Sequence, residues 1–486
     1  MGVTLMKNFK ASSEHDLYNR DLKPLDDNEK QVKPLGYGVI WFGIALQLGA
    51  FVSYSPLVYQ LTIGQFMIAI LLGAAILIAL SFIAKDIGIK YGLSFAVSVS
   101  AAFGYRGGQI VNFIRLIPAI FFTTINTYIG AAALNEIFKI VFGVDMFALS
   151  FAVNVALLIL VTVKKMKGIE LFMKIITPLL IIVGIYLFWE VLHTYNISFF
   201  EMFSMGNIQG ENPSIGTYIL ASSVIVGAYV NVALGMNDIS KDNKNYSDSN
   251  KWFQANKRYI FPVTIAVVPA FLFISILGSL VIVATGADGA DIISAISGIV
   301  TERSIALGIL LNVFIVVAQV STSVAANMLP GAYALSSFFP KKVSYTSGLY
   351  IFALAVIVFI PLTLGDQIQT IIALFSATLA PALAIIGVDY YIFRKRNIDI
   401  DALFNSRGKY RYSKGINIVA AAVFIITTLT GFIFFQDLSL YFTAPVAAVL
   451  YYICGKIFNK KYPYMVESDS GYKETNPVPM NKEHSS

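Results

Sequence analysis

The sequence predicts an all-α membrane protein with about twelve transmembrane helices. Of its 486 residues, 57% are hydrophobic and only 13% are charged, whereas a soluble globular chain carries about 25% charged residues. Apolar stretches also recur along the chain at the length of about 20 residues that a helix needs to cross a bilayer. A soluble enzyme and a disordered protein are therefore excluded, because a chain this apolar cannot keep its surface in water.

The predicted spans follow one another along the chain and are separated by more polar segments. The first six lie near residues 36–59, 61–84, 109–142, 146–163, 169–192 and 215–236. The other six lie near residues 260–284, 305–329, 344–364, 368–393, 416–435 and 439–457. The segments before the first span and after the last one are polar, so we expect them to be tails outside the membrane.

Basic residues fix the expected orientation of these spans. With the N-terminus in the cytoplasm, the inner segments hold 31 of the 35 Lys and Arg residues, and the outer loops hold essentially Arg303. Basic residues accumulate on the cytoplasmic side of membrane proteins. The asymmetry predicts a multi-pass protein of the cell membrane, in contact with the lipid bilayer, with both termini cytoplasmic. It also accounts for the net charge of +7 without a nucleic-acid partner.

The reactive residue types argue against an enzyme or a metal centre. The single cysteine, Cys454, excludes a disulfide framework and a Cys-based metal site. The three histidines, His15, His193 and His484, are too scattered for a metal or proton-relay cluster. A membrane enzyme would need acid, base or metal groups that converge. We therefore assign no catalytic residue and expect no cofactor.

Three spans carry polar residues and helix breakers at membrane depth, where an unsatisfied polar group is costly. They are the first span, with Gln47 and Pro56, the sixth, with Gly235, and the eighth, with Asn327 and Pro330. Spans one and six are five helices apart. Interrupted helices at such matching positions are typical of inverted-repeat transporters that bind their substrate near the midplane. Helix packing through small residues, with polar side chains between the helices, is the alternative.

This pattern divides the chain into a core and its additions. A ten-helix transport core is expected at 36–395, with two inverted repeats at about 36–195 and 214–395. The flanking segments are a cytoplasmic N-terminal tail at 1–35, a basic cytoplasmic loop at 396–415, two extra transmembrane helices at 416–457 and a cytoplasmic C-terminal tail at 458–486.

The eighth span also carries a possible cation site. Ala318, Ser321 and Thr322 are spaced i, i+3, i+4 and share one helical face. Hydroxyl and main-chain oxygens can replace water around a small monovalent cation. The span has no ionisable side chain, which favours Na⁺ over H⁺ as the coupling ion. Hydroxyls that bond to the preceding helical turn are an alternative reading, and the spacing alone does not decide between the two.

Several stretches in order resemble the nucleobase–cation symporter family, which contains the cytosine, purine, allantoin and hydantoin permeases. The similarity runs over about 36–395 and is specific through the order and spacing of its stretches rather than through one motif. The stretches are 89–95, 101–108 with Arg115, 125–130, 233–241, 321–327 and 332–340.

The resemblance implies a LeuT-type fold, a five-plus-five inverted repeat plus two C-terminal helices. It implies cation-coupled symport, with Na⁺ as the coupling ion, of a small heterocycle of the cytosine, purine, uracil, allantoin or hydantoin type. The implied cation site consists of Ala318, Ser321 and Thr322 with main-chain carbonyls around Gly43 and Leu46. The implied substrate site consists of Gln47, Phe122, Asn126, Tyr229 and Asn327.

Three of these positions depart from the family pattern. The family usually has Trp where this chain has Phe122, often Trp where it has Tyr229, and commonly Gln where it has Asn126. We expect a pocket of different shape. The alternatives are a transporter of the same fold for amino acids or other small metabolites, and a proton-coupled nucleobase permease.

Charged residues near the inner ends of three spans complete the expectations. Arg115 is expected to extend its side chain toward the membrane surface. Asp238 is expected to pair with a nearby base or to cap a loop. Asp389 is expected to pair with Arg394 or Lys395.

Overall fold

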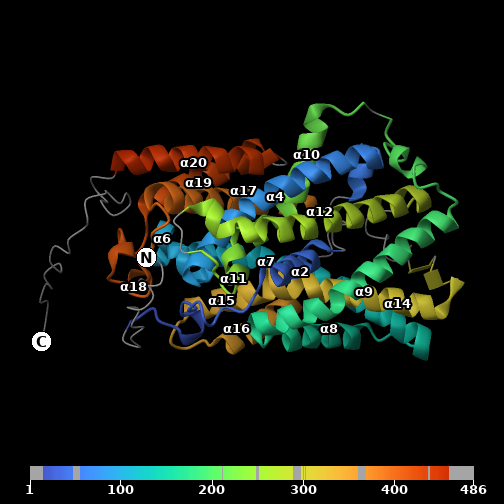
Figure 1. Ribbon diagram of the computed structural model, residues 1–486, viewed down its shortest axis with the longest axis horizontal. Helices are drawn as coiled ribbons and strands as arrows, with labels where there is room; N and C mark the ends of the chain where they lie inside the picture. The colour runs from blue at the N-terminus through green and yellow to red at the C-terminus, as the bar shows by residue number, and fades with distance from the viewer. Residues whose placement is uncertain are drawn as a thin grey trace, which may run out of the picture.

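A computed structural model describes residues 15–47, 55–210, 212–247, 251–287, 297–298, 300–301, 303–359, 368–435 and 438–458. Within this part of the chain the elements are helical, with three isolated β-bridges. The long helices run along the long axis of an elongated bundle (Figure 1). Eight helices of the described residues are long and apolar enough to cross a membrane, and four shorter ones are also apolar. The all-α class and the expectation of about twelve spans are confirmed.

The apolar helices correspond to the predicted spans in chain order. They are α2 (Pro34–Ala45), α4 (Ile63–Tyr91), α7 (Tyr105–Phe142), α8 (Phe147–Thr162), α9 (Lys165–Thr194), α10 (Ile215–Leu234), α12 (Trp252–Thr285), α14 (Ile305–Ser323) with α15 (Leu329–Phe338), α16 (Tyr345–Val358), α17 (Ile368–Gly387), α19 (Ile418–Phe434) and α20 (Ser439–Phe458). The shorter described elements are η1 (Arg20–Leu22), η2 (Ser55–Tyr59), α5 (Phe95–Ser98), α6 (Ser100–Phe103), η3 (Glu201–Ser204), α11 (Met236–Ser240), η4 (Val324–Met328), η6 (Val388–Phe393), α18 (Ile400–Leu403) and η7 (Lys409–Arg411).

The first span, predicted near residues 36–59, is interrupted, as the polar residues and helix breakers in its sequence indicate. Helix α2 ends at Ala45, and its last backbone hydrogen bond runs from Leu46 N–H to the Phe42 carbonyl at 2.9 Å. Leu46 has φ −80° and ψ 60°, outside the helical range. Gly49 and Ser53, which belong to the predicted first span, lie outside the described residues.

Helices α4 and α12 extend further toward the inner end of the bundle than the apolar stretches predicted. The added turns are polar, and their side chains are paired inside the protein. Asp86 accepts hydrogen bonds from Arg396 Nε at 2.8 Å and from Asn256 Nδ2 at 2.6 Å. Burying such groups is tolerated only when they are paired. Hydropathy alone could not detect these pairs, because the partners are distant in sequence.

The sixth span breaks at Gly235, between α10 and α11. The guanidinium of Arg115, on α7, fills the space beside Gly235 that a Cβ would occupy. A larger residue would have to displace this side chain, so the sequence needs glycine at the break. The eighth span does not break. It widens instead into the π segment η4, where Leu329 N–H donates to the Val324 carbonyl.

Proline accounts for this widening. Pro330 has no N–H, so it cannot supply the hydrogen bond that the Ala326 carbonyl would receive in an α-helix. A π segment inserts an extra residue into the turn and changes the direction of the side chains beside it, often at functional sites. The residue re-aimed here is Asn327.

The described part of the expected N-terminal tail, residues 15–33, packs against the same end of the bundle as the basic loop. Asn19 Nδ2 donates to the carbonyls of Pro340 at 2.8 Å and Val343 at 2.9 Å. Asp21 pairs with Lys165 at 2.7 Å. Figure 1 shows α6, α11 and α18 gathered at this end.

The last two spans are tied to the core through the inner end of the tenth. Arg394 pairs with Asp389 at 2.6 Å, as expected from the sequence. Tyr451 of α20 donates to the same carboxylate at 3.1 Å. These three buried side chains hold α20 against η6.

Candidate functional site

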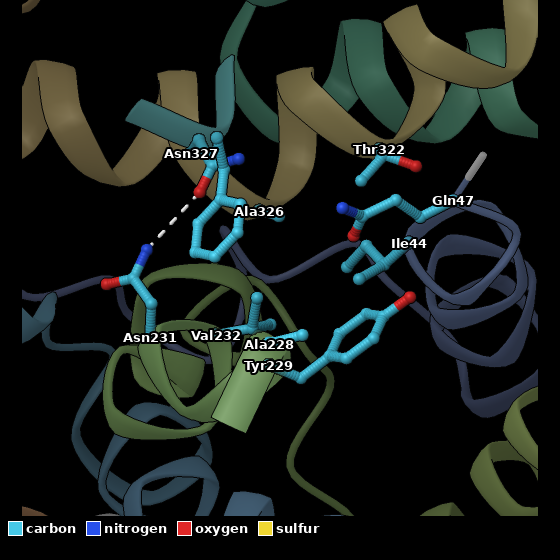
Figure 2. A pocket seen from close by; sticks show the side chains of 10 residues that line it. Ile44, Gln47, Ala228, Tyr229, Asn231, Val232, Thr322, Ala326 and Asn327 are labelled. Atoms are coloured by element: carbon cyan, nitrogen blue, oxygen red, sulfur yellow. Dashed lines mark hydrogen bonds between the residues drawn. The ribbon is translucent and has the colours of Figure 1, made fainter. Parts of the chain in front are cut away.

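A buried cavity lies where the interrupted first and sixth spans meet the π segment of the eighth. Ten residues line it, four of which the sequence assigned to the substrate site (Figure 2). The lining comes from the end of α2, from α7, from α10 and from the α14–η4 junction. The lining residues are Ile44, Gln47, Phe122, Ala228, Tyr229, Asn231, Val232, Thr322, Ala326 and Asn327.

The end of α2 brings a free amide and a free carbonyl to this place. The last four carbonyls of any helix lack an intrahelical partner, and Gly43 is among them because the helix stops at Ala45. Gln47 follows two residues beyond the helix. Its amide lines the cavity and has no hydrogen-bond partner among the described residues. The interruption therefore exposes polar groups that a continuous helix would have kept paired.

Four oxygens converge beside the cavity, between α2 and α14. Thr322 Oγ1 donates to the Gly43 carbonyl at 3.0 Å, and Ser321 Oγ lies 3.2 Å from the same oxygen. Both hydroxyls also contact the Ala318 carbonyl, at 2.8 Å from Ser321 and 3.3 Å from Thr322. The hydroxyls therefore bond both to the preceding turn and to the facing helix, and the cation site stays a prediction.

Leu46 is the fifth residue assigned to this cation site. Its main chain is non-helical and its side chain is buried, close to the oxygens in sequence. No hydrogen bond to its carbonyl is found among the described residues. A Cβ at Gly43 would meet the sulfur of Met173 on α9, so a larger residue there would displace that side chain.

Tyr229 of α10 contacts the end of α2 directly. Its hydroxyl donates to the Ala45 carbonyl at 3.2 Å, and its ring lies 4.8 Å from the Phe271 ring, centroid to centroid. The hydroxyl thereby satisfies another of the unpaired carbonyls at the end of α2. This bond ties the interrupted first span to the sixth.

Phe122 of α7 contributes an aromatic face on another wall. Its ring lies 5.6 Å from Phe121 and 6.0 Å from Phe375 of α17, both edge to face. Such contacts hold a ring in a defined orientation. The phenyl group fills less of the cavity than a tryptophan would.

Asn126 is not among the lining residues. Its Nδ2 donates to Ser323 Oγ at 3.1 Å, one helical turn from Phe122 on α7. Its Oδ1 is buried and has no partner in the described part of the chain. The structure therefore places Asn126 behind the cavity wall, where the short side chain bonds to α14.

Sequence reasoning missed Asn231 as a separate site residue. It lines the cavity from α10, and its Nδ2 donates to Asn327 Oδ1 at 3.2 Å. The available signal was a carboxamide in the middle of the sixth span, four residues before Gly235. The small or aliphatic lining residues Ile44, Ala228, Val232 and Ala326 carried no such signal and were missed as well.

Arg115 and Asp238 form a buried ion pair below the cavity. Arg115 Nη1 lies 2.7 Å from Asp238 Oδ2, and Asp238 also accepts from Phe95 N–H at 2.8 Å. The expectation that Arg115 reaches the membrane surface was wrong, because its side chain is only 5% exposed. Pairing of Asp238 with a base is confirmed.

The chemistry of the lining suits a neutral, partly polar molecule. None of the ten lining residues carries a charge. Two aromatic rings and three carboxamides line the cavity, and carboxamides can both donate and accept hydrogen bonds. The cavity is contracted: the centre of a water molecule has about 10 Å³ in which to move, enough for about one water. A ring-sized molecule needs these side chains to move apart.

A comparison with known proteins finds that this chain is similar to membrane permeases. The family model for permeases of cytosine/purines, uracil, thiamine and allantoin matches residues 24–457. A hydantoin permease from Microbacterium maritypicum is 29% identical over 457 residues, which cover 93% of this chain and 92% of that protein. An allantoin permease from Bacillus subtilis (strain 168) is 26% identical over 86% of this chain and 87% of that protein.

Solved structures are similar as well. Mhp1, a nucleobase-cation-symport-1 family transporter in a closed conformation with bromovinylhydantoin bound, matches with a TM-score of 0.87 at 27% identity, over 93% of this chain and 98% of that one. Its inward-facing conformation matches with a TM-score of 0.81 at 27% identity, over 93% and 96%. A Na⁺-coupled sialic acid symporter matches with a TM-score of 0.62 at 15% identity, over 95% and 94%, which shows the fold alone.

Proposed function

Because the chain belongs to the permease family for cytosine/purines, uracil, thiamine and allantoin, we propose that it is a symporter that couples import of a small neutral heterocycle to Na⁺. Its membership makes it a multi-pass membrane transporter with a LeuT-type fold and not an enzyme. The observation that carries the proposal is the cavity between the two interrupted spans, with the hydroxyl-bearing face of α14 beside it.

The substrate class follows from the lining and from the relatives. A hydantoin permease and an allantoin permease are among the similar proteins, and the similar structure of Mhp1 holds a hydantoin. Phe122 and Tyr229 offer aromatic faces for a flat ring, and Gln47 and Asn327 offer amides for its polar edge. Asn126 acts from behind the wall through Ser323. The uncharged lining offers no cationic side chain to the carboxylate of an amino acid, which would instead need the N-terminus of a half-helix.

The coupling ion follows from the oxygens between α2 and α14. Na⁺ would be held by the carbonyls of Gly43, Leu46 and Ala318 and by the hydroxyls of Ser321 and Thr322. Hard oxygen donors of this kind replace the water around an alkali cation. The four converging oxygens among them now share hydrogen bonds that an ion would replace. The ten lining residues include no Asp, Glu, His or Lys that could carry the coupled proton.

Transport proceeds by alternating access of this site to the two sides of the membrane. In inverted-repeat transporters one repeat or bundle rocks against the other around a fixed midplane site. The positive-inside distribution of Lys and Arg supports cytoplasmic termini.

Uptake into proteoliposomes tests this function. Radiolabelled hydantoin, allantoin, uracil, cytosine and leucine are presented with an inward Na⁺ gradient or with K⁺ in its place, at one fixed pH. Accumulation of at least one heterocycle, stimulated by Na⁺, is expected, with no accumulation of leucine. Accumulation of leucine alone, or equal heterocycle uptake with Na⁺ and with K⁺, would contradict the proposal.

A further inference from the structure

The hydrogen bond between Asn231 and Asn327 joins two lining residues at one side of the cavity (Figure 2) and sets the direction of one substrate-facing amide. We propose that Asn231 is a positioning residue that fixes Asn327 as a hydrogen-bond donor, so that the site selects substrates that present an acceptor there. A ring carbonyl or an unprotonated ring nitrogen is such an acceptor. This inference rests on the proposed function, because it assumes that the cavity binds a heterocycle.

The geometry leaves Asn327 one free polar atom. Asn231 Nδ2 donates to Asn327 Oδ1 at 3.2 Å, from α10 across to η4. Figure 2 shows the oxygen of Asn327 turned toward Asn231 and its nitrogen turned away. That nitrogen has no hydrogen-bond partner among the described residues. It is the atom that Asn327 can offer to a molecule in the cavity.

A carboxamide can normally serve as donor or acceptor by turning over. Asn327 cannot turn over alone, because its NH₂ would then face the NH₂ of Asn231 and their hydrogen bond would be lost. Both side chains are at most 3% exposed, and a heterocycle bound in the cavity would displace any water beside them, so water does not replace the lost partner in the complex. A buried polar group left without a partner is costly. Asn231 therefore removes one of the two states of Asn327.

Turning both amides over is also disfavoured. In the observed arrangement the buried Oδ1 of Asn231 has no partner in the described part of the chain. Turning both would put an NH₂ in its place, and an orphaned N–H group is rarer in proteins than an under-satisfied oxygen. The observed direction is the one that leaves an oxygen behind the wall and a donor toward the cavity.

Two hydrogen bonds hold the backbone carbonyl of Asn231 in place. Its carbonyl accepts from Gly235 N–H at 3.3 Å and from Arg115 Nε at 3.4 Å. Arg115 is in turn fixed by its ion pair with Asp238. The break of the sixth span is thus braced where the Asn231 side chain leaves α10, so the direction of the amide pair is built into the fold.

Carbonyl-deleted analogues of hydantoin test the proposal. Two are used: 2-imidazolidinone, which lacks the C4 carbonyl, and 4-imidazolidinone, which lacks the C2 carbonyl. Binding to the purified full-length protein is expected to weaken about tenfold or more for the analogue that lacks the carbonyl facing Asn327. A second comparison uses uracil against cytosine and isocytosine, which carry an amino group in place of the C4 or the C2 carbonyl, and the wild type should show the same penalty for the isomer whose amino group faces Asn327. In Asn231→Leu, which removes the donor at similar volume, the penalty for that isomer should fall below about threefold, because the freed Asn327 amide can turn and accept from the amino group.

The control is Asn312→Leu. Asn312 is a buried asparagine of α14 whose Nδ2 bonds to the Gly308 carbonyl, and it does not line the cavity. It should keep the wild-type penalty. An unchanged penalty for that isomer in Asn231→Leu, with uracil still bound, would overturn the inference and leave the proposed function standing. Equal affinity of the wild type for hydantoin and for both analogues would also overturn the inference and leave the proposed function standing. If the wild type bound none of hydantoin, allantoin, uracil and cytosine, the proposed function would be overturned as well.

Discussion

The hydroxyl of Thr322 donates to the main-chain oxygen of Gly43 at 3.0 Å, across the space between α14 and α2. The Gly43 carbonyl is free to accept because α2 ends two residues later. One interruption of a helix therefore exposes both the oxygen that we propose for the cation and, through Gln47, an amide that we propose for the substrate. Ion and substrate sites that share one short segment are a direct route to coupling between them.

Thr322→Val tests the cation site. Valine keeps the shape of threonine and removes the oxygen, so Na⁺ stimulation of uptake should be lost or its half-saturating Na⁺ concentration should rise about tenfold or more, the scale of one lost ligand bond. Uptake measured over a range of Na⁺ concentrations gives this value. The matched control is Thr427→Val, a buried threonine of α19 that bonds only within its own helix. Undiminished Na⁺ dependence in Thr322→Val would remove Thr322 from the site.

Asn327→Ala tests the substrate site. It removes the amide that lines the cavity and leaves the Asn231 donor without its partner. Substrate affinity should fall about tenfold or more, as measured by equilibrium binding of whichever heterocycle the wild type accumulates. The substrate affinity of Gln47→Ala should fall by a similar factor, because the Gln47 amide also lines the cavity and has no hydrogen-bond partner among the described residues. Unchanged affinity in both variants would place the substrate elsewhere.

The Arg115–Asp238 pair predicts strongly non-additive effects on stability. Each single variant, Arg115→Met or Asp238→Leu, leaves a buried charge without a partner, which costs about 3–5 kcal/mol. The double variant removes both charges and should be more stable than either single variant. Thermal unfolding of the purified wild type and variants ranks their stabilities. The exposed pair of Lys139 and Glu136 is the control, because Lys139→Met there should change little. Additive losses would show that the two charges act independently.

Cysteine labelling tests the orientation. In a Cys454→Ser background, single cysteines replace Lys414, in the basic loop predicted to be cytoplasmic, and Glu201, in η3 between the fifth and sixth spans, which is predicted to lie outside. A membrane-impermeant maleimide added to intact cells should label the Glu201 position, and the Lys414 position should react only after permeabilisation. The opposite pattern would invert the topology derived from the Lys and Arg distribution.

The sequence predicted the helical class, the spans and the two interrupted helices because hydropathy and helix breakers are local properties. It could not predict where the first span would unwind, since Ala45 and Leu46 look alike in hydropathy and the end is set by Tyr229 and Thr322 from other helices. The burial of the Arg115 side chain could not be predicted for the same reason, because its partner Asp238 lies 123 residues away.

The sequence predicted the polar residues of the candidate site, which lie at membrane depth, better than the apolar residues that line its wall. Gln47, Tyr229 and Asn327 stand out against their spans, and they line the cavity. Asn231 escaped notice because its role depends on its hydrogen bond to Asn327, a contact that the π segment η4 creates. Family likeness assigned Asn126 to the substrate, whereas its shorter side chain reaches Ser323 instead.

Coupled flux is the most direct test of the whole account. Proteoliposomes that hold the full-length protein are given an inward gradient of the accumulated heterocycle, with tracer ²²Na⁺ outside at equal Na⁺ concentration on both sides. The account predicts that the heterocycle drives ²²Na⁺ inward in the wild type and does so no longer in Thr322→Val. Heterocycle entry with no accompanying ²²Na⁺ movement in the wild type would contradict it.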